Sequence, residues 1–314
     1  MAMVKNDNDT TGRVYQKVVQ IVEILVLFIK IFTEIFISTV KLFLGEKQKD
    51  VSGEIVLITG TGHGIGRELA LQYAALGATV ICVDINEAGN KETVREANSQ
   101  GEGEAFGYVC DVSKREQVLE VARKVQKEVG SVSVLINNAG IMPTHSLEQH
   151  TPEEIRRVFD INVLSHFWTL EAFLPDMREK NRGHVVSISS IAGHVGLSNL
   201  VPYCASKFAV RGLLEALHEE YREKGITCIK TTCVSPYMVN TGLCKKPKVK
   251  FPGILGLQDP KDVASAIIEA QRKDLKDITI PLGLYQFGSF CRLFPVKCQL
   301  LIKDYIDSGV ESDL

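Results

Sequence analysis

The chain lacks the patterns that define several common protein classes. Its 314 residues carry a formal net charge of −2, so no basic excess predicts a nucleic-acid partner. None of its eight cysteines forms a C-x-x-C pair, and several lie inside apolar runs. Ligand spacings typical of a metal site are missing as well. We therefore expect reduced, mostly buried thiols in a chain that faces the cytosol, and no metal. No internal repeat or low-complexity tract interrupts the sequence.

The N-terminal part also lacks a secretory signal and a clean membrane span. Residues 14–44 are rich in Val, Ile, Leu and Phe, but no basic start and small-residue cleavage site frame them. Charged residues interrupt this stretch, among them Glu23, Lys30, Glu34 and Lys41. Because charges are costly at the centre of a bilayer, the segment is a poor transmembrane helix.

The spacing of those four charges favours a helix that lies on a membrane. At 100° per residue they fall within about 40° of one another, and apolar side chains occupy the rest of the circumference. Such a helix binds the membrane interface with its apolar side down. A tilted span, or packing on the protein's own core or on a dimer partner, remains an alternative. Residues 1–50 are predicted to form this anchoring helix and a polar linker.

From residue 54, short apolar runs alternate with helical stretches. This pattern predicts a parallel sheet covered by helices on both faces, hence an α/β doubly wound (Rossmann) domain over residues 51–282. The seven expected strands are 54–60, 78–84, 105–111, 132–138, 183–190, 226–235 and 277–282. The expected helices are 64–76, 87–99, 114–129, 152–178, 203–223 and 259–272.

A glycine-rich turn, TGTGHGIG, joins the first strand to the first helix of this domain. Gly60, Gly64 and Gly66 permit a tight turn and a close approach to a pyrophosphate, which the amides of the helix N-terminus then bind. Asp84 ends the next strand, eighteen residues after Gly66. This context, and not the glycines alone, predicts a dinucleotide site.

Asp84 favours NAD over NADP. Its carboxylate can accept hydrogen bonds from both adenosine ribose hydroxyls and would repel a 2′-phosphate. His63 in the turn is the complication, because a partly cationic imidazole would help to bind a phosphate; its alternative is a solvated loop histidine. Asp111, followed by Val112, ends the third strand, where it would meet the adenine edge or cap the helix at 114.

Tyr203 and Lys207 share one face of a predicted helix, four residues apart. A lysine charge ~4.5 Å from a phenol, at an effective dielectric of ~20, is worth about 3 to 4 kcal/mol, or roughly 2 to 3 pKa units. That shift would bring Tyr203 near working pH, where a general acid/base is most useful. A surface Tyr/Lys pair is the alternative for this spacing alone.

Further polar residues surround that pair at the expected carboxyl ends of strands, where doubly wound folds bind ligands. Ser190 ends the strand thirteen residues before Tyr203, and the NNAG segment, residues 137–140, ends another strand. Asn162 lies in the following helix. In this order and spacing, these motifs resemble the classical short-chain dehydrogenases/reductases over about residues 54–282.

The resemblance implies a role for each motif residue. Tyr203 is the proton donor or acceptor, and Lys207 lowers its pKa and binds the nicotinamide ribose. Ser190 positions the substrate oxygen, and Asn162 organises a water chain that relays the proton. With the residues discussed above, the expected cofactor-binding set is Gly60, His63, Gly64, Ile65, Gly66, Asp84, Asp111, Val112, Asn138, Ala139, Gly140, Tyr203, Lys207, Pro236, Val239 and Thr241.

One departure from the family pattern follows the sixth strand. Pro236 is followed by Tyr237 where the family usually has glycine, so the nicotinamide side of the cleft is expected to have a different shape. The segments SHFWTLEAFLP, PYCASKFA and KTTCVSP, with the anchoring helix, resemble one subgroup of retinol and 17-beta-hydroxysteroid dehydrogenases. That subgroup implies lipophilic alcohol substrates and residence on the endoplasmic reticulum membrane or lipid droplets. The wider family implies a homodimer.

Two segments near the C-terminus carry less specific signals. Residues 241–260 lie where the family has its substrate lid, and their lysines would contact anionic headgroups or simply be solvated. These lysines are Lys245, Lys246, Lys248 and Lys250. The apolar tail, residues 282–302, would be a second membrane contact, a cap on the substrate cleft or a helix packed on the core. Residues 283–314 are treated as a C-terminal extension.

These observations predict a membrane-associated, NAD-dependent alcohol dehydrogenase. Its expected substrate is retinol, a steroid or a long-chain alcohol, with Tyr203 as general acid/base. An NADP-linked carbonyl reductase is the first alternative. A non-catalytic coat protein of lipid droplets is the second, although such a protein has no need of the full set of motif residues.

Overall fold

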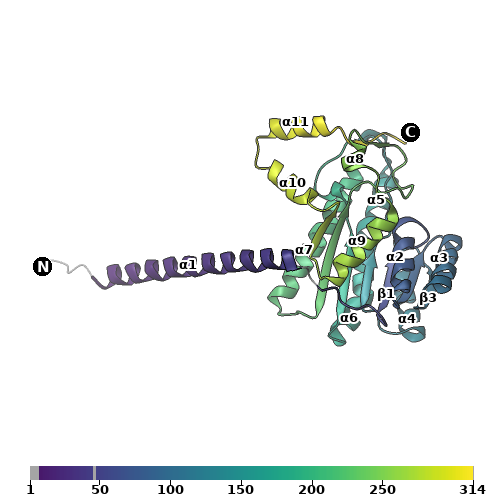
Figure 1. The fold of residues 1–314 in the computed structure, drawn as a ribbon, viewed down its shortest axis with the longest axis horizontal. Coiled ribbons are helices and arrows are strands. Elements are labelled where there is room, and N and C mark those ends of the chain that lie inside the picture. Colours follow the sequence, from purple (N-terminus) through teal and green to yellow (C-terminus); the bar gives the residue numbers. More distant parts are fainter. Residues whose placement is uncertain (1–6, 45–46, 314) are drawn as a thin grey trace. The chain divides into compact units, whose positions relative to one another are not determined.

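The computed structural model describes residues 7–44 and 47–313, and these form two units, residues 1–48 and 49–314 (Figure 1). The first unit consists of helix α1 (Asp7–Leu44), and the second contains the sheet with its helices. The C-terminal segment after residue 282 belongs to the second unit. Each unit is described here by itself.

Helix α1 has exposed apolar side chains along most of its length. Leu25, Phe28 and Phe32 are 56%, 52% and 68% exposed, respectively. Glu23 and Glu34 are exposed on the helix as well. Among the described residues, no helix combines the length and the apolar character that crossing a bilayer requires.

Seven parallel strands form the central sheet of the second unit, as the sequence predicts. Each lies within one of the expected apolar runs, except that the sixth extends by one residue to Pro236. The strands are β1 (Ile55–Thr59), β2 (Thr79–Asp84), β3 (Ala105–Val109), β4 (Val134–Asn137), β5 (Gly183–Ile188), β6 (Ile229–Pro236) and β8 (Asp277–Ile280).

The strand order is β3-β2-β1-β4-β5-β6-β8, with every neighbouring pair parallel. The chain winds outward from β1 in one direction and from β4 in the other. This reversal opens a crevice at the carboxyl ends of β1 and β4, which is where doubly wound sheets bind their ligands. The two expected ligand segments, the glycine-rich turn and NNAG, follow these two strands.

Helices cover both faces of this sheet. Helices α2 (Gly64–Ala75), α3 (Glu87–Gln100) and α9 (Pro260–Arg272) pack on one face, and α4 (Arg115–Glu128), α6 (Ser165–Glu179) and α7 (Val201–Glu223) on the other. Alternate side chains of β1 enter the two cores: Val56 and Ile58 join the first, and Leu57 joins the second. This period of two fixes the register of a strand buried on both sides.

The expected single helix over residues 152–178 is interrupted. The structure has α5 (Pro152–Phe159), a π-helical turn η2 (Asp160–Leu164) and then α6. Asn162 lies in this turn and is fully buried. Its side chain accepts from the backbone N–H of Ile141 at 2.9 Å and donates to the Ile141 carbonyl at 3.0 Å. The π turn therefore brings Asn162 to the loop after β4.

The C-terminal tail forms α10 (Leu284–Cys291) and α11 (Val296–Ile306), beside the short helix α8 (Pro252–Leu255) (Figure 1). Its end pairs antiparallel with the loop after β6, through β9 (Gly309–Val310) and β7 (Pro247–Lys248). The four lysines of that loop contact the tail: Lys245 with Asp313, Lys246 with Ser312, Lys248 with Asp307 and Lys250 with Tyr305. All four lysines remain exposed, so contact with anionic headgroups and simple solvation both stay predictions.

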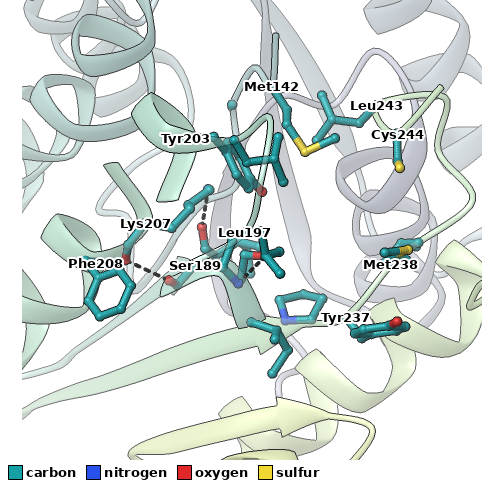
Figure 2. A pocket seen from close by; sticks show the side chains of 18 of the residues that line it. Met142, Ser189, Leu197, Tyr203, Lys207, Phe208, Tyr237, Met238, Leu243 and Cys244 are labelled. Atoms are coloured by element: carbon teal, nitrogen blue, oxygen red, sulfur yellow. Dashed lines mark hydrogen bonds between the residues drawn. The ribbon is translucent and has the colours of Figure 1, made fainter. Parts of the chain in front are cut away.

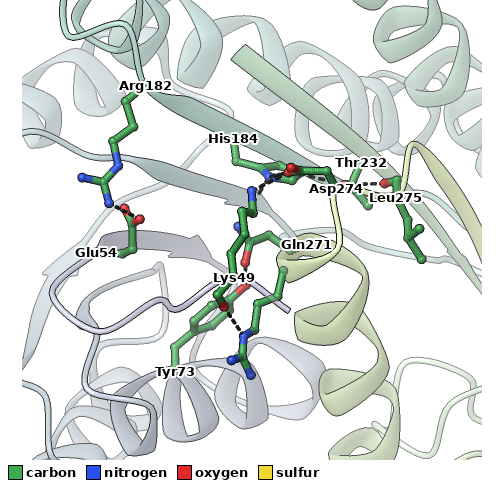
Figure 3. Close-up of polar contacts among 10 residues, drawn as sticks. Lys49, Glu54, Tyr73, Arg182, His184, Thr232, Gln271, Asp274 and Leu275 are labelled. Carbon is green, nitrogen blue, oxygen red and sulfur yellow. Dashed lines mark hydrogen bonds and ion pairs between the residues drawn. The ribbon is translucent and has the colours of Figure 1, made fainter. Parts of the chain in front are cut away.

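A polar network holds the start of the second unit near the amino ends of β5 and β8 (Figure 3). Asp274 binds the Lys49 ammonium and lies 3.3 Å from Nδ1 of buried His184. Gln271 lies between His184 and the buried Tyr73 hydroxyl, at 3.4 and 3.2 Å. The bond with His184 and then the Lys49 contact lower the pKa of Asp274 to about 2. This network joins residue 49 to β5, α2 and α9.

Candidate active site

The glycine-rich turn leaves no room for side chains. Gly60 and Gly64 have φ values of 76° and 60°, a region that glycine occupies without strain. A Cβ on Gly66 would lie 2.0 Å from the Gly60 carbonyl oxygen and 2.6 Å from Nδ2 of Asn138. Asn138 itself donates from Nδ2 to the carbonyls of Thr59 and Gly60, at 2.9 and 3.1 Å. The turn is therefore fixed against the end of β4, with the N-terminus of α2 facing the crevice.

Asp84 is held rigidly at the end of β2. Its Oδ2 accepts from the Gly62 N–H and its Oδ1 from the Asn86 N–H, both at 2.7 Å. The carboxylate lines the same cavity as the glycine-rich turn, as the sequence predicts. His63, beside it, is exposed and makes no side-chain cap on α2. The residues present therefore fit a dinucleotide: a close-packed turn, a helix N-terminus and a preoriented carboxylate.

Asp111 lines this end of the cavity, and its expected alternative as a helix cap is wrong. The N-cap of α4 is Lys114. Asp111 instead accepts hydrogen bonds at Oδ1 from the Ser113 N–H and hydroxyl, at 3.0 and 2.7 Å. Val112, buried at 8% exposure, lines the cavity beside it.

One cavity of about 1060 Å³ lies at the carboxyl ends of the strands. It brings together nearly all of the predicted site residues. Two of them, Gly66 and Asn162, are buried behind its wall and do not line it. The predicted residues that do line it are Gly60, His63, Gly64, Ile65, Asp84, Asp111, Val112, Asn138, Ala139, Gly140, Ser190, Tyr203, Lys207, Pro236, Val239 and Thr241.

Tyr203 and Lys207 are both buried in this cavity, at 7% and 4% exposure (Figure 2). Burial raises the pKa of Tyr203 to about 12, and a hydrogen bond with Ser190 opposes that rise. The expected fall toward neutral pH is therefore wrong for this structure. The expectation counted only the charge of Lys207, whereas desolvation of the phenolate is the larger effect here.

Lys207 is oriented by the backbone. Its Nζ donates to the Ile188 carbonyl at 2.8 Å and lies 5.6 Å from the centroid of the Tyr203 ring. Burial lowers the pKa of this ammonium to about 8. At neutral pH the cavity thus holds a protonated phenol and a lysine that is mostly charged. Ser189, next to the predicted Ser190, donates to the Lys207 carbonyl at 2.9 Å and ties α7 to the end of β5.

Tyr237, the departure from the family pattern, stands at the wall of this cavity. Its N–H donates to the Ile280 carbonyl at 2.8 Å, which continues the pairing of β6 and β8. Among the described residues its buried hydroxyl has no hydrogen-bond partner. Next to it, Thr241 packs against Gly64 so closely that a Cβ on that glycine would lie 2.9 Å away. The loop after β6 therefore closes over the glycine-rich turn.

The part of the cavity beyond Tyr203 is apolar (Figure 2). Met142, Leu197, Met238 and Cys244 pack around a small core that contains Tyr203. Sequence reasoning missed these residues, because nothing in their spacing marks them. The tail supplies further lining from α10 and α11, including Phe287, Arg292, Val296, Leu300, Lys303 and Ile306. The cap was one of the predicted alternatives for the tail.

Both charged tail residues named in this lining donate hydrogen bonds to backbone carbonyls. Arg292 donates to the carbonyl of His194, and Lys303 donates to the Gly196 carbonyl at 3.0 Å. The tail also exposes apolar side chains to the outside: Leu293, between the two helices, is 80% exposed, and Leu301, on α11, is 68% exposed. The tail therefore covers the cavity and also presents an apolar outer surface.

A glycine-rich turn that fits a dinucleotide and shares one cavity with Ser190, Tyr203 and Lys207 is typical of an NAD(P)-dependent oxidoreductase. Comparison with known proteins specifies the class further: residues 54–249 match the short chain dehydrogenase family. The chain is 43% identical to human epidermal retinol dehydrogenase 2, over 84% of this chain and 85% of that protein. It is 38% identical to human 17-beta-hydroxysteroid dehydrogenase 13, over 90% and 93%.

A solved structure shows the same fold. The short chain dehydrogenase/reductase from Burkholderia phymatum, in complex with NAD, aligns with a TM-score of 0.71 at 24% identity and covers 84% of this chain and 99% of its own. The chain therefore belongs to the short chain dehydrogenase family, as the sequence motifs predicted. It is an NAD(P)-dependent oxidoreductase that acts on CH–OH groups.

Proposed function

We propose that the protein oxidises a lipophilic alcohol with NAD, or reduces the corresponding carbonyl. The observation that carries this proposal is the cavity, in which one end is built for a dinucleotide and the other is an apolar space around the Tyr203 hydroxyl. Relatives named as retinol and 17-beta-hydroxysteroid dehydrogenases support the substrate class, which is retinol, a steroid or a long-chain alcohol.

In the proposed reaction the cofactor carries the hydride, and the residues of the chain orient the substrate and move the proton. The bound nicotinamide supplies hydride acceptance in oxidation and hydride donation in reduction. Tyr203 takes the hydroxyl proton as the alcohol becomes a carbonyl, and returns it in the reverse direction. Ser190 holds the substrate oxygen beside Tyr203, and Lys207 binds the nicotinamide ribose and favours the phenolate. Asn162 fixes the loop after β4 and organises the water chain that relays the proton.

The direct test is turnover by the detergent-purified chain with all-trans-retinol, estradiol and a long-chain alcohol. Reduced-nicotinamide absorbance is followed with NAD and then with NADP. Turnover of one alcohol with NAD supports the proposal, and turnover only with NADP supports the carbonyl reductase alternative. Binding of NAD without turnover of any alcohol would favour the coat-protein alternative.

We predict that Asp84→Asn shifts the cofactor preference toward NADP. The amide keeps an oxygen acceptor for one of the two backbone N–H groups that Asp84 binds, and it removes the charge that repels a 2′-phosphate. The ratio of kcat/KM for NAD to that for NADP is expected to fall by about tenfold or more. Asp111→Asn is the matched control, because its carboxylate lines the same end of the cavity. An unchanged ratio in Asp84→Asn would show that another residue selects the cofactor.

We also propose that the protein binds the endoplasmic reticulum membrane or the lipid-droplet surface, with the catalytic unit in the cytosol. Two observations support this, each within its own unit. Helix α1 exposes apolar side chains around a narrow charged stripe, and the tail exposes Leu293 and Leu301. Two separate apolar segments suit stable attachment, which usually takes more than one signal.

Vesicle flotation tests the membrane proposal. Leu25 and Phe32 lie opposite the charged stripe of α1, so Leu25→Glu/Phe32→Glu is expected to weaken binding to phosphatidylcholine vesicles by about tenfold or more. The control, Gln16→Glu/Leu27→Glu, adds the same charge near the stripe and is expected to float as the unmodified chain does. Equal loss in both variants would mean that charge alone, rather than an apolar face, governs binding.

A homodimer is the proposed assembly. Leu164 on η2 and Phe167 on α6 are 38% and 48% exposed. Such apolar side chains on neighbouring helices suit an interface with a second copy. Sedimentation equilibrium of the chain in detergent is expected to give the dimer mass, and Phe167→Glu to give the monomer. A monomer mass for the unmodified chain would contradict the proposal.

A further inference from the structure

Two histidines and a glutamate meet outside the cavity described above. His145 follows the NNAG segment, His150 precedes α5, and Glu154 lies in its first turn. Nε2 of His145 is 3.1 Å and Nδ1 of His150 is 3.6 Å from Oε2 of Glu154. One donor atom from each residue lies within 4.8 Å of the other two. A short turn, Leu147–Gln149, lies between the two histidines. Their spacing in the sequence therefore matches no familiar metal-ligand motif.

His150 is the unusual member of this group. Its side chain is fully buried, yet neither ring nitrogen has a hydrogen-bond partner among the residues that the structure describes. The His145 ring stacks on it, with the centroids 3.8 Å apart. Buried polar atoms are nearly always hydrogen-bonded, so two orphaned nitrogens on one imidazole call for an explanation. A ligand held at the nitrogen that faces Glu154 supplies one.

We propose that His145, His150 and Glu154 bind a divalent transition-metal ion of the zinc type. Imidazole nitrogen and carboxylate oxygen are preferred ligands of Zn²⁺, and two histidines with one glutamate form an established three-ligand set. The three donor atoms already lie within 4.8 Å of one another, so one ion can be reached by all three side chains.

The surroundings agree with an ion that enters from solvent. The side chain of Glu154 is 39% exposed and lines a second hollow together with Met142 and Arg157. The two histidines lie behind it and close the inner side. Three protein ligands leave a coordination position for water on the Glu154 side. The capping contact of Glu154 with the Thr151 N–H, at 3.2 Å, orients the carboxylate as a supporting hydrogen bond orients a ligand.

The ion would fix one end of the loop that borders the oxidoreductase cavity. Asn162 holds this loop at Ile141, and the Thr144 carbonyl accepts from the N–H of Asp313 in the tail at 2.7 Å. Met142, between these points, lines the cavity. Metal bound to His145 and His150 would join the far end of the loop to α5. The proposed site is therefore structural, and its occupancy would set how firmly Met142 borders the apolar space.

The test uses the full chain without an affinity tag, treated with a chelator and then dialysed. Calorimetric titration with Zn²⁺ is expected to show one ion per chain. At a hundredfold excess of Zn²⁺ over Kd, the Tm is expected to rise by about 4 °C or more. Mg²⁺, which prefers all-oxygen sites, is expected to leave the Tm unchanged. Co²⁺ is expected to give visible absorption without the charge-transfer band of thiolate ligands, which distinguishes this site from the cysteines.

Variants separate the site from adventitious binding. His145→Ala, His150→Ala and Glu154→Gln are each expected to weaken Zn²⁺ binding by more than about 100-fold, since loss of a mere hydrogen-bonded partner of a ligand costs about 10–100-fold. Glu154→Gln preserves size and the capping acceptor, so it serves where a histidine variant does not fold. His218→Ala, an equal truncation elsewhere, is expected to bind normally. Failure of the unmodified chain to bind Zn²⁺, or equal binding by Glu154→Gln, would overturn the proposal.

Discussion

Tyr203→Phe is expected to lower kcat by about 10²–10⁴-fold while leaving NAD affinity nearly unchanged. The substitution keeps the ring and its packing in the buried cluster and removes only the hydroxyl that exchanges a proton with the substrate. Because the phenol of Tyr203 has a pKa of about 12 in this structure, it is protonated at neutral pH and already in the form that donates to a carbonyl. Steady-state kinetics in both directions, with NAD binding measured separately, gives the two quantities.

Tyr108→Phe is the matched control for this measurement. The Tyr108 hydroxyl donates to Glu128 at 2.7 Å on an exposed surface, so its loss removes the same group without touching the cavity. Activity within about tenfold of the unmodified enzyme in Tyr203→Phe would show that another group moves the proton. Unchanged vesicle binding by Tyr203→Phe is expected in either case, because the apolar segments that would attach the protein to a membrane are intact.

The sheet was predictable because most of its strands are buried on both faces, although the edge strand β3 exposes Gly107 and Val109. An apolar run that is continuous over four to eight residues, followed by a helical stretch, leaves few alternatives to a parallel sheet. The interruption at Asn162 was not predictable in the same way. A π turn adds one residue to a helix and barely alters the apolar period, whereas its cause, the two hydrogen bonds to Ile141, joins residues twenty-one positions apart.

The sequence predicted which residues form the site better than it predicted their pKa values. Motif spacing placed Ser190, Tyr203 and Lys207 together, because strand ends and one helix face fix their neighbourhood. The pKa of Tyr203 depends on how completely the whole cavity excludes water, which no local spacing contains. The apolar lining by Met142 and Cys244 was missed for a related reason: single apolar residues in loops carry no periodic signal.

The position of the C-terminal tail depends on strand pairing that the sequence did not predict. Its apolar composition suited a membrane contact, a cap on the cleft or core packing equally well. The β7–β9 pairing and the bond between Lys248 and Asp307 place it over the cavity. Helices α10 and α11 therefore line the proposed substrate space, while Leu293 and Leu301 stay exposed.

Gly66→Ala is expected to have the second large effect. Its Cβ would fall 2.0 Å from the Gly60 carbonyl oxygen and 2.6 Å from Nδ2 of Asn138. The first atom is backbone, and the second is held by hydrogen bonds to the carbonyls of Thr59 and Gly60, so neither can move aside freely. The turn must shift, which breaks the bonds that Asn138 makes to it. We expect a loss of about 3 kcal/mol in the free energy of unfolding, measured in urea, and at least tenfold weaker NAD binding.

Gly212→Ala provides the contrast that makes this result interpretable. Gly212 lies within α7, is exposed, and has no atom within 4 Å of the position that a Cβ would take. Because alanine is the better helix former, this variant is expected to be more stable by about 0.5–1 kcal/mol with normal NAD affinity. If Gly→Ala lowers the free energy of unfolding at position 66 and raises it at position 212, the loss is caused by the crowded turn and not by the added methyl group itself. If Gly66→Ala bound NAD as the unmodified chain does, the turn would have to be looser than its contacts with Asn138 imply, and the dinucleotide would have to be held elsewhere.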